Sequence, residues 1–549
     1  MSFLLTDIPR ILPEILLLVL ALLILGSDVF ERWAAGEQVA LERHRASASL
    51  AALGLGMIFV IVLLQSGYLY TVPDTADSNY FTNLLRNLQA GIPRGSNVPL
   101  PVMDMFATDH LTIIGRLLFT GAAFLIVLLT YDNPPLRNPG EFYSLLVLST
   151  LGMCLMAGAT ELIMLFLAIE LTSIPLYVLA GYFRNDRQSV EAGMKYFLYG
   201  AFSSALLLYG MSFVYGYASS TAVAADLTAL PTSVMTSFDT LRELIAQAGE
   251  PAPILLIGML LMIAGIGYKI AVVPFHGWSP DVYQGAPTTM TAFISTASKA
   301  AGFFLLLRVL DTVFPNVVGN PIPVFDEFGG WTGMLALLAA LTLIVANLAA
   351  LPQTNAKRLL AYSGIAHAGF LLMGVIAQAA PFSTDRLNGV VALLYYLVVY
   401  ALMNIGAFGV IAIVAQDTGS DEITALNGLA QRNLGLAVLF TVFVFALAGI
   451  PPLAGFFAKF YIMLAVWQAN AIWLVVIALI STIPALYYYL RLLRAVFIMP
   501  PDRATPMPAP RWMMTSLVVS AVLVLVLGLF PAPLLNVLEQ VQVQVIAGR

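Results

Sequence analysis

Long apolar runs recur along this chain almost from end to end, and they constrain its fold more than any other feature. A helix needs about 20 apolar residues to cross about 30 Å of hydrocarbon, so runs of about 17–25 residues indicate membrane spans. Because a segment in lipid must satisfy its own backbone polar groups, we predict an all-α, polytopic membrane protein with about fourteen transmembrane helices. The runs lie at residues 10–29, 46–66, 109–130, 142–158, 161–182, 190–217, 254–276, 287–311, 330–350, 358–379, 388–414, 434–463, 470–495 and 511–534.

The composition supports a membrane environment and excludes other classes of protein. The chain is 60% hydrophobic and 10% charged, whereas soluble domains average about 25% charged residues. The net charge of −5 is spread over 549 residues and indicates no nucleic-acid partner. The first apolar run lacks a basic segment before it and contains Glu14, which favours a retained span over a cleaved signal peptide.

Cofactor-binding motifs are missing from the sequence. A single cysteine, Cys154, excludes an iron–sulfur cluster and an internal disulfide. His44, His110, His276 and His367 do not have the spacing of metal ligands, and neither a GxGxxG fingerprint nor a P-loop is present. We therefore predict no cofactor and no metal in this chain.

Lysine and arginine residues set the predicted orientation. With the N-terminus outside, thirteen of them fall in inside connections and six in outside connections. This excess follows the positive-inside rule and predicts a membrane protein with both termini outside. Polar stretches at 67–108, 218–253 and 312–329 are predicted as long loops, and Arg116 and Arg308 as helix-end anchors.

A faint internal repeat relates two distant helices. The triplet IST at 294–296 is followed by Arg308, and the triplet IST at 480–482 is followed by Arg494 at the same offset. The two segments are five helices apart in the predicted order. An odd separation predicts that one copy is inverted relative to the other, as in many transporters.

Lysines within the apolar runs are the strongest functional signal. Lys195, Lys269, Lys299 and Lys459 lie in such runs, whereas Lys357 lies at an inside helix end where its ammonium can snorkel. A lysine at the bilayer centre costs at least about 2.5–3.5 kcal/mol, so such residues usually face a protein interior or a water-filled path. These lysines predict ion or proton movement.

A glutamate and a histidine extend the set of buried titratable groups. At a rise of about 1.5 Å per residue, Glu170, Lys269, Lys299 and His367 each lie about 14–22 Å along their helices, near the midplane. The unperturbed pKa of histidine, near 6.5, suits a proton relay. We predict a row of proton-transfer groups on four helices.

Structural roles remain open for several of these residues. Glu170 and Lys269 could form a buried pair that only holds helices together. Glu191 precedes Lys195 by four residues, the favoured order for a local helix ion pair, although both could also extend the proton path. His367 lies on a small polar helix face and could be a hydrogen-bonded packing residue.

Helix-breaking residues accompany the buried charges. Pro274 follows Lys269, the sequence GIPP at 449–452 precedes Lys459, and Pro175 follows the buried glutamate. Proline removes a backbone hydrogen bond, and non-helical backbone at membrane depth persists only where protein or water satisfies it. We expect breaks that supply polar backbone, room for water and a joint.

Five stretches resemble the antiporter-like subunits of proton-pumping NADH:quinone oxidoreductase, respiratory complex I. The ending SPDVYQGAPTT of the first is more similar to the subunit N branch than to subunits L and M. The resemblance covers about residues 140 to 495. The stretches are GYKIAVVPFHGWSPDVYQGAPTT (267–289), LFLAIELTSIPLYVLAGY (165–182), KYFLYGAFSSALLLYG (195–210), KRLLAYSGIAHAGFLLMG (357–374) and LAGIPPLAGFFAKFYIM (447–463).

The resemblance implies fourteen helices, with helices four to eight and nine to thirteen forming inverted repeats that contain broken helices. The implied divisions are 1–140 for three N-terminal helices, 141–313 and 328–498 for the repeats, and 499–549 for helix fourteen.

The resemblance also implies roles for five residues. Glu170 resembles the family's helix-five glutamate, Lys269 its helix-seven lysine and Lys299 its bridging helix-eight lysine. His367 resembles the central helix-ten histidine, and Lys459 the helix-twelve lysine. Together they would carry protons.

The function implied is proton translocation driven by electron transfer in other subunits. Flavin, iron–sulfur clusters and quinone would lie in those partners, which include the sister subunit M and small membrane subunits. Lipids and protons are the other expected partners, and the bacterial plasma membrane is the expected location.

Two alternatives stay open. The chain could belong to a multi-subunit cation/proton antiporter, a relative with the same inverted-repeat core, although the sequence DVYQ at 281–284 argues against it. It could also be a non-conducting scaffold whose buried pairs serve only assembly.

Overall fold

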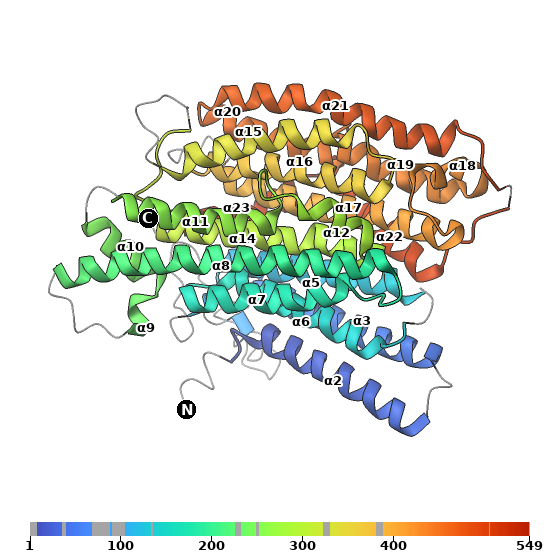
Figure 1. The fold of residues 1–549 in the computed structure, drawn as a ribbon, viewed down its shortest axis with the longest axis horizontal. Coiled ribbons are helices and arrows are strands. Elements are labelled where there is room, and N and C mark those ends of the chain that lie inside the picture. The colour runs from blue at the N-terminus through green and yellow to red at the C-terminus, as the bar shows by residue number, and fades with distance from the viewer. Residues whose placement is uncertain are drawn as a thin grey trace, which may run out of the picture.

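Helices make up nearly all of the structure. The computed structural model describes residues 8–35, 40–68, 88–89, 105–132, 136–224, 232–248, 252–321, 330–379, 388–503 and 505–547. Within these ranges no β-strand forms, and the only β-type pairings are three isolated bridges. Most helices run side by side along the long axis, with α2 (Leu12–Ala35) at one edge and α21 (Ile472–Phe497) at the opposite edge (Figure 1).

Thirteen helices in the described ranges are long and apolar enough to cross a membrane. Each falls on one predicted run, and the remaining run at 434–463 is divided between two shorter apolar helices. The prediction of a polytopic all-α membrane protein is therefore confirmed. Besides α2 and α21, the spans are α3 (Ala40–Ser66), α5 (His110–Tyr131), α6 (Pro139–Gly158), α7 (Leu162–Ala180), α8 (Arg187–Ala224), α11 (Pro253–Ile270), the segment Thr288–Val313, α15 (Trp331–Ala350), α16 (Ala356–Ala377), α17 (Gly389–Thr418), the pair α19 (Leu434–Ala448) and α20 (Ala454–Gln468), and α22 (Arg511–Leu529).

Two of the predicted breaks are true interruptions. α11 ends at Ile270, its C-cap Ala271 is left-handed with φ 57°, and the chain resumes as α12 (Trp278–Gly285). α19 ends before Gly449, which has φ 85°, and α20 begins after residue 453. Both connections contain a cis proline, at Pro274 and at Pro452.

The expected break at Pro175 is wrong, because α7 continues through it from Leu162 to Ala180. Hydroxyl groups in the same turn bond to the helix backbone: Thr172 donates to the Ala168 carbonyl and Ser173 to the Ile169 carbonyl. Polar side chains and neighbouring helices commonly let a membrane helix tolerate proline in this way.

The span at Thr288–Val313 is wound irregularly around its lysine. α13 (Thr288–Phe293) is followed by the π-helix η2 (Ile294–Ser298), then α14 (Lys299–Arg308), then a second π-helix η3 (Val309–Val313). π-helical turns are rare and occur frequently at functional sites.

Some loop predictions are wrong. The stretch 218–253 is not one loop, because α8 extends to Ala224 and two short helices follow, α9 (Thr232–Met235) and α10 (Phe238–Gln247). A further helix, α23 (Ala532–Ala547), follows the predicted last span. Most of the 67–108 loop lies outside the described residues, as does 322–329. Short turns η4 (Ile423–Leu426) and α18 (Leu429–Arg432) connect α17 to α19.

The exterior is apolar and the centre is closely packed. Leu53, Phe202 and Ile483 are 74%, 66% and 70% exposed, as expected for side chains that face lipid. The Thr288–Val313 span, α16 and α17 are almost entirely buried. The buried lysines and histidine described below lie on or beside these central helices.

Candidate functional site

Lys269 lies near the end of α11 and is held by a hydroxyl group of another helix. Its side chain is 8% exposed, and Nζ donates a 2.9 Å hydrogen bond to Ser173 Oγ of α7. Glu170, one turn earlier on α7, is half-buried and accepts a 2.5 Å hydrogen bond from Ser204 of α8. No carboxylate of the described residues lies within 4 Å of Lys269 Nζ, so the predicted pair is near but not in direct contact.

A small cavity lies beside the Lys269 side chain. It measures about 20 Å³ and is lined by Ser173, Ser204 and Lys269, among others. That volume admits about one water molecule, which needs two to four polar partners. Ser173, which is bonded to Lys269, and Ser204, which is bonded to Glu170, thus both face this cavity.

Lys299 reaches α16 across the centre of the bundle. Its Nζ donates a 2.6 Å hydrogen bond to the Gly364 carbonyl and lies 5.9 Å from the centre of the Tyr400 ring. A Cβ at Gly364 would lie 2.8 Å from Tyr400 Oη and 3.3 Å from Lys299 Nζ. A side chain at this position would therefore displace the Tyr400 hydroxyl and crowd the Lys299 ammonium.

His367 is bonded on both ring nitrogens to tyrosine hydroxyls. Nδ1 lies 2.6 Å from Tyr396 Oη, and Nε2 lies 3.2 Å from Tyr489 Oη. Tyr489 Oη also lies 2.5 Å from Ser363 Oγ. The His367 and Tyr400 rings are 5.2 Å apart, so the tyrosine that contacts Lys299 also contacts the histidine.

Lys459 is held by backbone at the α19–α20 interruption. Its Nζ donates 2.9 Å hydrogen bonds to the Leu447 and Ala448 carbonyls, the last of α19. It also lies 5.5 Å from the centre of the Phe370 ring, one turn beyond His367 on α16. The structure therefore arranges Lys269, Lys299, His367 and Lys459, here named the central row, on α11, α14, α16 and α20.

Lys195 belongs to a different cluster. Its Nζ lies 2.6 Å from Glu191, the predicted local pair, and 2.6 Å from Asp281 of α12. Arg358 of α16 also lies 2.6 Å from Asp281. The side chains of Lys195 and Glu191 are 35% and 62% exposed, so this cluster is much wetter than the central row.

Three expectations about basic side chains are wrong. Arg116 is not a helix-end anchor: it is fully buried and lies 2.7 Å from Glu14. Arg308 instead pairs at 2.6 Å with Asp109, the N-cap of α5. Lys357 does not snorkel but is buried beside Asp421 at 3.0 Å.

The sequence could not show these partners, since each carboxylate lies 64 to 199 positions from its base. Burial alone would raise the pKa of the Asp109 carboxyl, but the Arg308 guanidinium holds it below its usual range.

Several site residues carry no sequence signal of their own. Ser173, Ser204 and Gly364 are common residue types in membrane helices. Tyr396 and Tyr400 stand four residues apart on α17, and that helical spacing could have indicated a shared polar face. Among the described residues, no three histidine, cysteine or acidic side chains are grouped so that they could hold a metal ion.

Comparison with known proteins places this geometry in a family. Residues 159–483 match the family described as NADH:quinone oxidoreductase/Mrp antiporter, transmembrane. NADH-quinone oxidoreductase subunit N 1 of Roseiflexus castenholzii is 53% identical over 533 residues, which cover 97% of each chain. The chain belongs to the NADH-quinone oxidoreductase subunit N family.

Solved structures share the fold of this chain. A chain of respiratory complex I from Thermus thermophilus, solved with bound aureothin, is 30% identical with a TM-score of 0.70, and the match covers 95% of this chain and 98% of that one. A chain of the Mrp complex from Dietzia sp. has a TM-score of 0.73 at 18% identity, covering 97% of each chain. The latter likeness shows a shared fold alone.

Proposed function

We propose that this chain carries protons across the membrane within an NADH:quinone oxidoreductase, through Glu170 and the central row. Electron transfer in other subunits would drive the movement, with flavin, iron–sulfur clusters and quinone bound there and none in this chain. The sister subunit M and small membrane subunits would be its neighbours. The expected setting is the bacterial plasma membrane, with both termini outside.

One observation carries this proposal: neutral groups hold the four buried bases of the central row. Lys269 is bonded to a serine hydroxyl, Lys299 and Lys459 to backbone carbonyls, and His367 to tyrosine hydroxyls. A lysine locked to a carboxylate is strongly held in its charged form, whereas these partners leave the base able to lose its proton.

The contacts between neighbours support transfer along the row. Tyr400 contacts both Lys299 and His367, and Phe370 joins the histidine helix to Lys459. Like charges this close oppose one another, so a proton arriving at one base favours release from the next. Buried hydroxyls without a partner among the described residues, Ser298 Oγ and Tyr400 Oη, add sites that ordered water commonly satisfies.

The Lys195 cluster has a separate place in this proposal. Lys195 and Glu191, together with Asp281 and Arg358, form a partly exposed network at one end of α8 and α12. We assign it to the entrance of the path, because its side chains are partly exposed and lie outside the central row, while such ion pairs contribute little stability themselves.

The alternatives are weaker but testable. A cation/proton antiporter subunit is supported by the fold shared with the Mrp chain and by a family description that includes Mrp antiporters, whereas the 53% relative is a subunit N. A non-conducting scaffold would need the buried bases only for assembly. The test is Lys299→Met in the assembled complex in proteoliposomes, with Arg187→Met, an exposed residue outside the row, as the control.

We expect proton pumping per electron to fall sharply in Lys299→Met, with a normal amount of assembled complex and no change when sodium is replaced by potassium. Normal pumping in Lys299→Met would refute the central row as a path. Loss of assembly together with pumping would favour the scaffold, and sodium dependence would favour the antiporter.

A further inference from the structure

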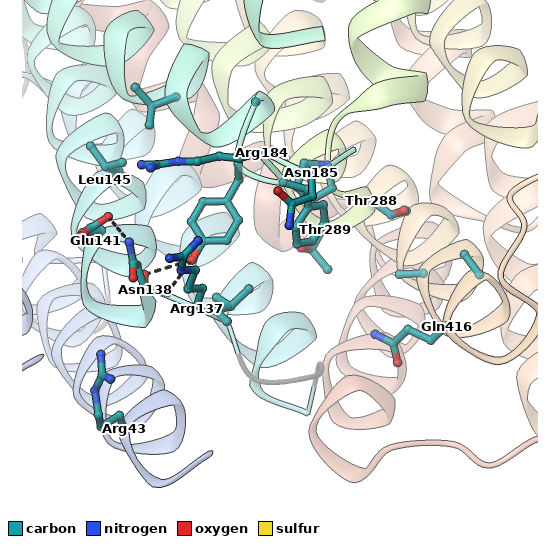
Figure 2. Close-up of a pocket in the computed structure, with 18 of the residues that line it drawn as sticks. Arg43, Arg137, Asn138, Glu141, Leu145, Arg184, Asn185, Thr288, Thr289 and Gln416 are labelled. Carbon is teal, nitrogen blue, oxygen red and sulfur yellow. Dashed lines mark hydrogen bonds between the residues drawn. The ribbon is translucent and has the colours of Figure 1, made fainter. Parts of the chain in front are cut away.

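A large charged cavity opens at the end of the bundle, away from the central row. It measures about 1020 Å³. It lies between the N-terminal helices α2 and α3, the ends of α6 and α7, the start of α13 and the end of α17. Figure 2 shows Arg137, Asn138 and Arg184 on one side and Thr288, Thr289 and Gln416 on the opposite side.

Arginine supplies most of the charged side chains of the lining. Arg32 and Arg43 share the buried carboxylate of Asp28, at 2.6 Å and 2.9 Å, and Arg32 lies 3.7 Å from Glu141. Two further arginines, at 137 and 184, are exposed and form no ion pair with any described residue. Four guanidinium groups thus face two carboxylates, which leaves an excess of two positive charges.

The lining also holds an unpaired hydrogen-bond donor and a polar side chain fixed in position. Arg32 Nε is buried and has no acceptor among the described residues. Asn138 is held in place by Glu141 at 2.8 Å and by the Tyr182 hydroxyl. A planar guanidinium binds phosphate oxygens in pairs, so this lining is suited to a phosphate group.

The cavity also reaches the lipid-facing surface. Leu145 and Val178 belong to its lining, and Val178 is 52% exposed. Phe183, also in the lining, is 46% exposed. In Figure 2 the Arg184 side chain extends toward Leu145, so charge and apolar surface meet within one site. A free phosphate would satisfy the arginines but leave this apolar wall uncovered.

We propose that this cavity binds the headgroup of an anionic phospholipid, with its phosphate at Arg137 and Arg184 and its acyl chains along Leu145, Val178 and Phe183. Basic pockets between membrane helices at the inside face are known to hold such headgroups. This end of the bundle is the one predicted to lie inside. The bound lipid would tie α2 and α3 to α13, which leads into the helix of Lys299.

The first test measures lipid affinity. The complex, purified in detergent and stripped of lipid, is titrated with phosphatidylglycerol and with phosphatidylcholine, and bound lipid is counted by native mass spectrometry. Each basic residue near anionic lipid is worth about a fivefold change in affinity. The double variant Arg137→Gln with Arg184→Gln should therefore bind phosphatidylglycerol roughly 25-fold more weakly.

The control is Arg187→Gln, an exposed arginine at the same end that does not line the cavity. It should bind phosphatidylglycerol normally. Equal phosphatidylglycerol binding by the double variant and this control would overturn the proposal. Displacement of the lipid by millimolar inorganic phosphate would also overturn it, since the site would then be a free-anion site.

A second test does not depend on the stability of the double variant. A photoreactive residue placed at Asn185, in the lining, should form an adduct with phospholipid in the assembled complex. An adduct with a neighbouring subunit instead would show that the cavity is a protein interface, and the proposal would be wrong.

Discussion

The two interrupted helices, α11–α12 and α19–α20, both hold a buried lysine ammonium, but with different chemical groups. Each places a buried lysine beside a left-handed cap, at Ala271 in the first and Gly449 in the second. Lys269 precedes its left-handed cap by two residues, whereas Lys459 follows its own by ten. Each interruption falls in the fourth helix of one of the two predicted five-helix groups.

What holds the ammonium differs between the two. Lys269 bonds to a side-chain hydroxyl, Ser173, with Glu170 one turn away beyond a small cavity. Lys459 bonds to two carbonyls at the C-terminus of α19, the negative end of the helix dipole. The first environment can change when a side chain rotates, while the second is fixed by the backbone. This difference suggests a switchable lysine at one end of the path and a constant one at the other.

The largest expected effect is at the switchable lysine. Glu170→Gln removes the nearest negative charge, and a charge of this kind changes the ratio of charged to neutral partner by roughly 10- to 1000-fold. We expect pumping per electron to fall at least about tenfold in proteoliposomes while the complex still assembles. Glu170→Asp should keep part of the function.

The double variant Glu170→Gln with Lys269→Ala sharpens this test. Interacting groups are not additive, so the double change should be little worse than either single change. If the two defects simply add, Glu170 and Lys269 do not act as a coupled unit, and Lys269 is not a switchable lysine.

The next effect is at the constant lysine. In Lys459→Arg the charge remains, but the neutral fraction of an arginine is at least roughly 100-fold smaller than that of a lysine. We expect normal assembly, preserved bonds to the α19 carbonyls, and strongly slowed pumping. Lys459→Ala should pump poorly as well. Wild-type pumping by the arginine variant would mean that Lys459 never releases its proton.

A moderate effect is expected when only the side-chain partner is removed. Ser173→Ala deletes one hydrogen bond to a charged group, worth about 1.5–3 kcal/mol, although water in the adjacent cavity can replace part of it. Pumping should fall less than in Glu170→Gln. The matched control is Ser149→Ala, which removes a buried serine of α6 whose hydroxyl donates to the Thr172 carbonyl of α7. Equal losses in the two variants would show a packing effect.

The smallest effects concern the two caps. Gly449→Ala forces a side chain into the left-handed region, which costs about 1–2 kcal/mol, and its Cβ would lie 3.0 Å from Lys459 Cδ. Ala271→Gly relieves the same strain and should change the stability by at most about 1 kcal/mol. Thermal unfolding of the purified complex measures both changes. A stable Gly449→Ala variant with normal pumping would show that the cap does not position Lys459.

Much of the fold was readable from local sequence. The number and place of the spans follow from apolar length, because a helix in lipid satisfies its own backbone. The breaks at Pro274 and at 449–452 follow from proline and glycine chemistry within a few residues. Pro175 shows the limit of that reasoning, since hydroxyls and neighbouring helices let α7 pass through it.

The tertiary structure alone decided what each buried group touches. Lys269 meets Ser173 from 96 positions away, Lys299 meets the Gly364 carbonyl from 65, and Arg116 meets Glu14 from 102. Apolar length marks a helix as membrane-spanning but does not say which face meets which neighbour. The sequence by itself thus determined that charges lie within the membrane, and the packing of helices determined whether each is locked to a carboxylate or held by a neutral group.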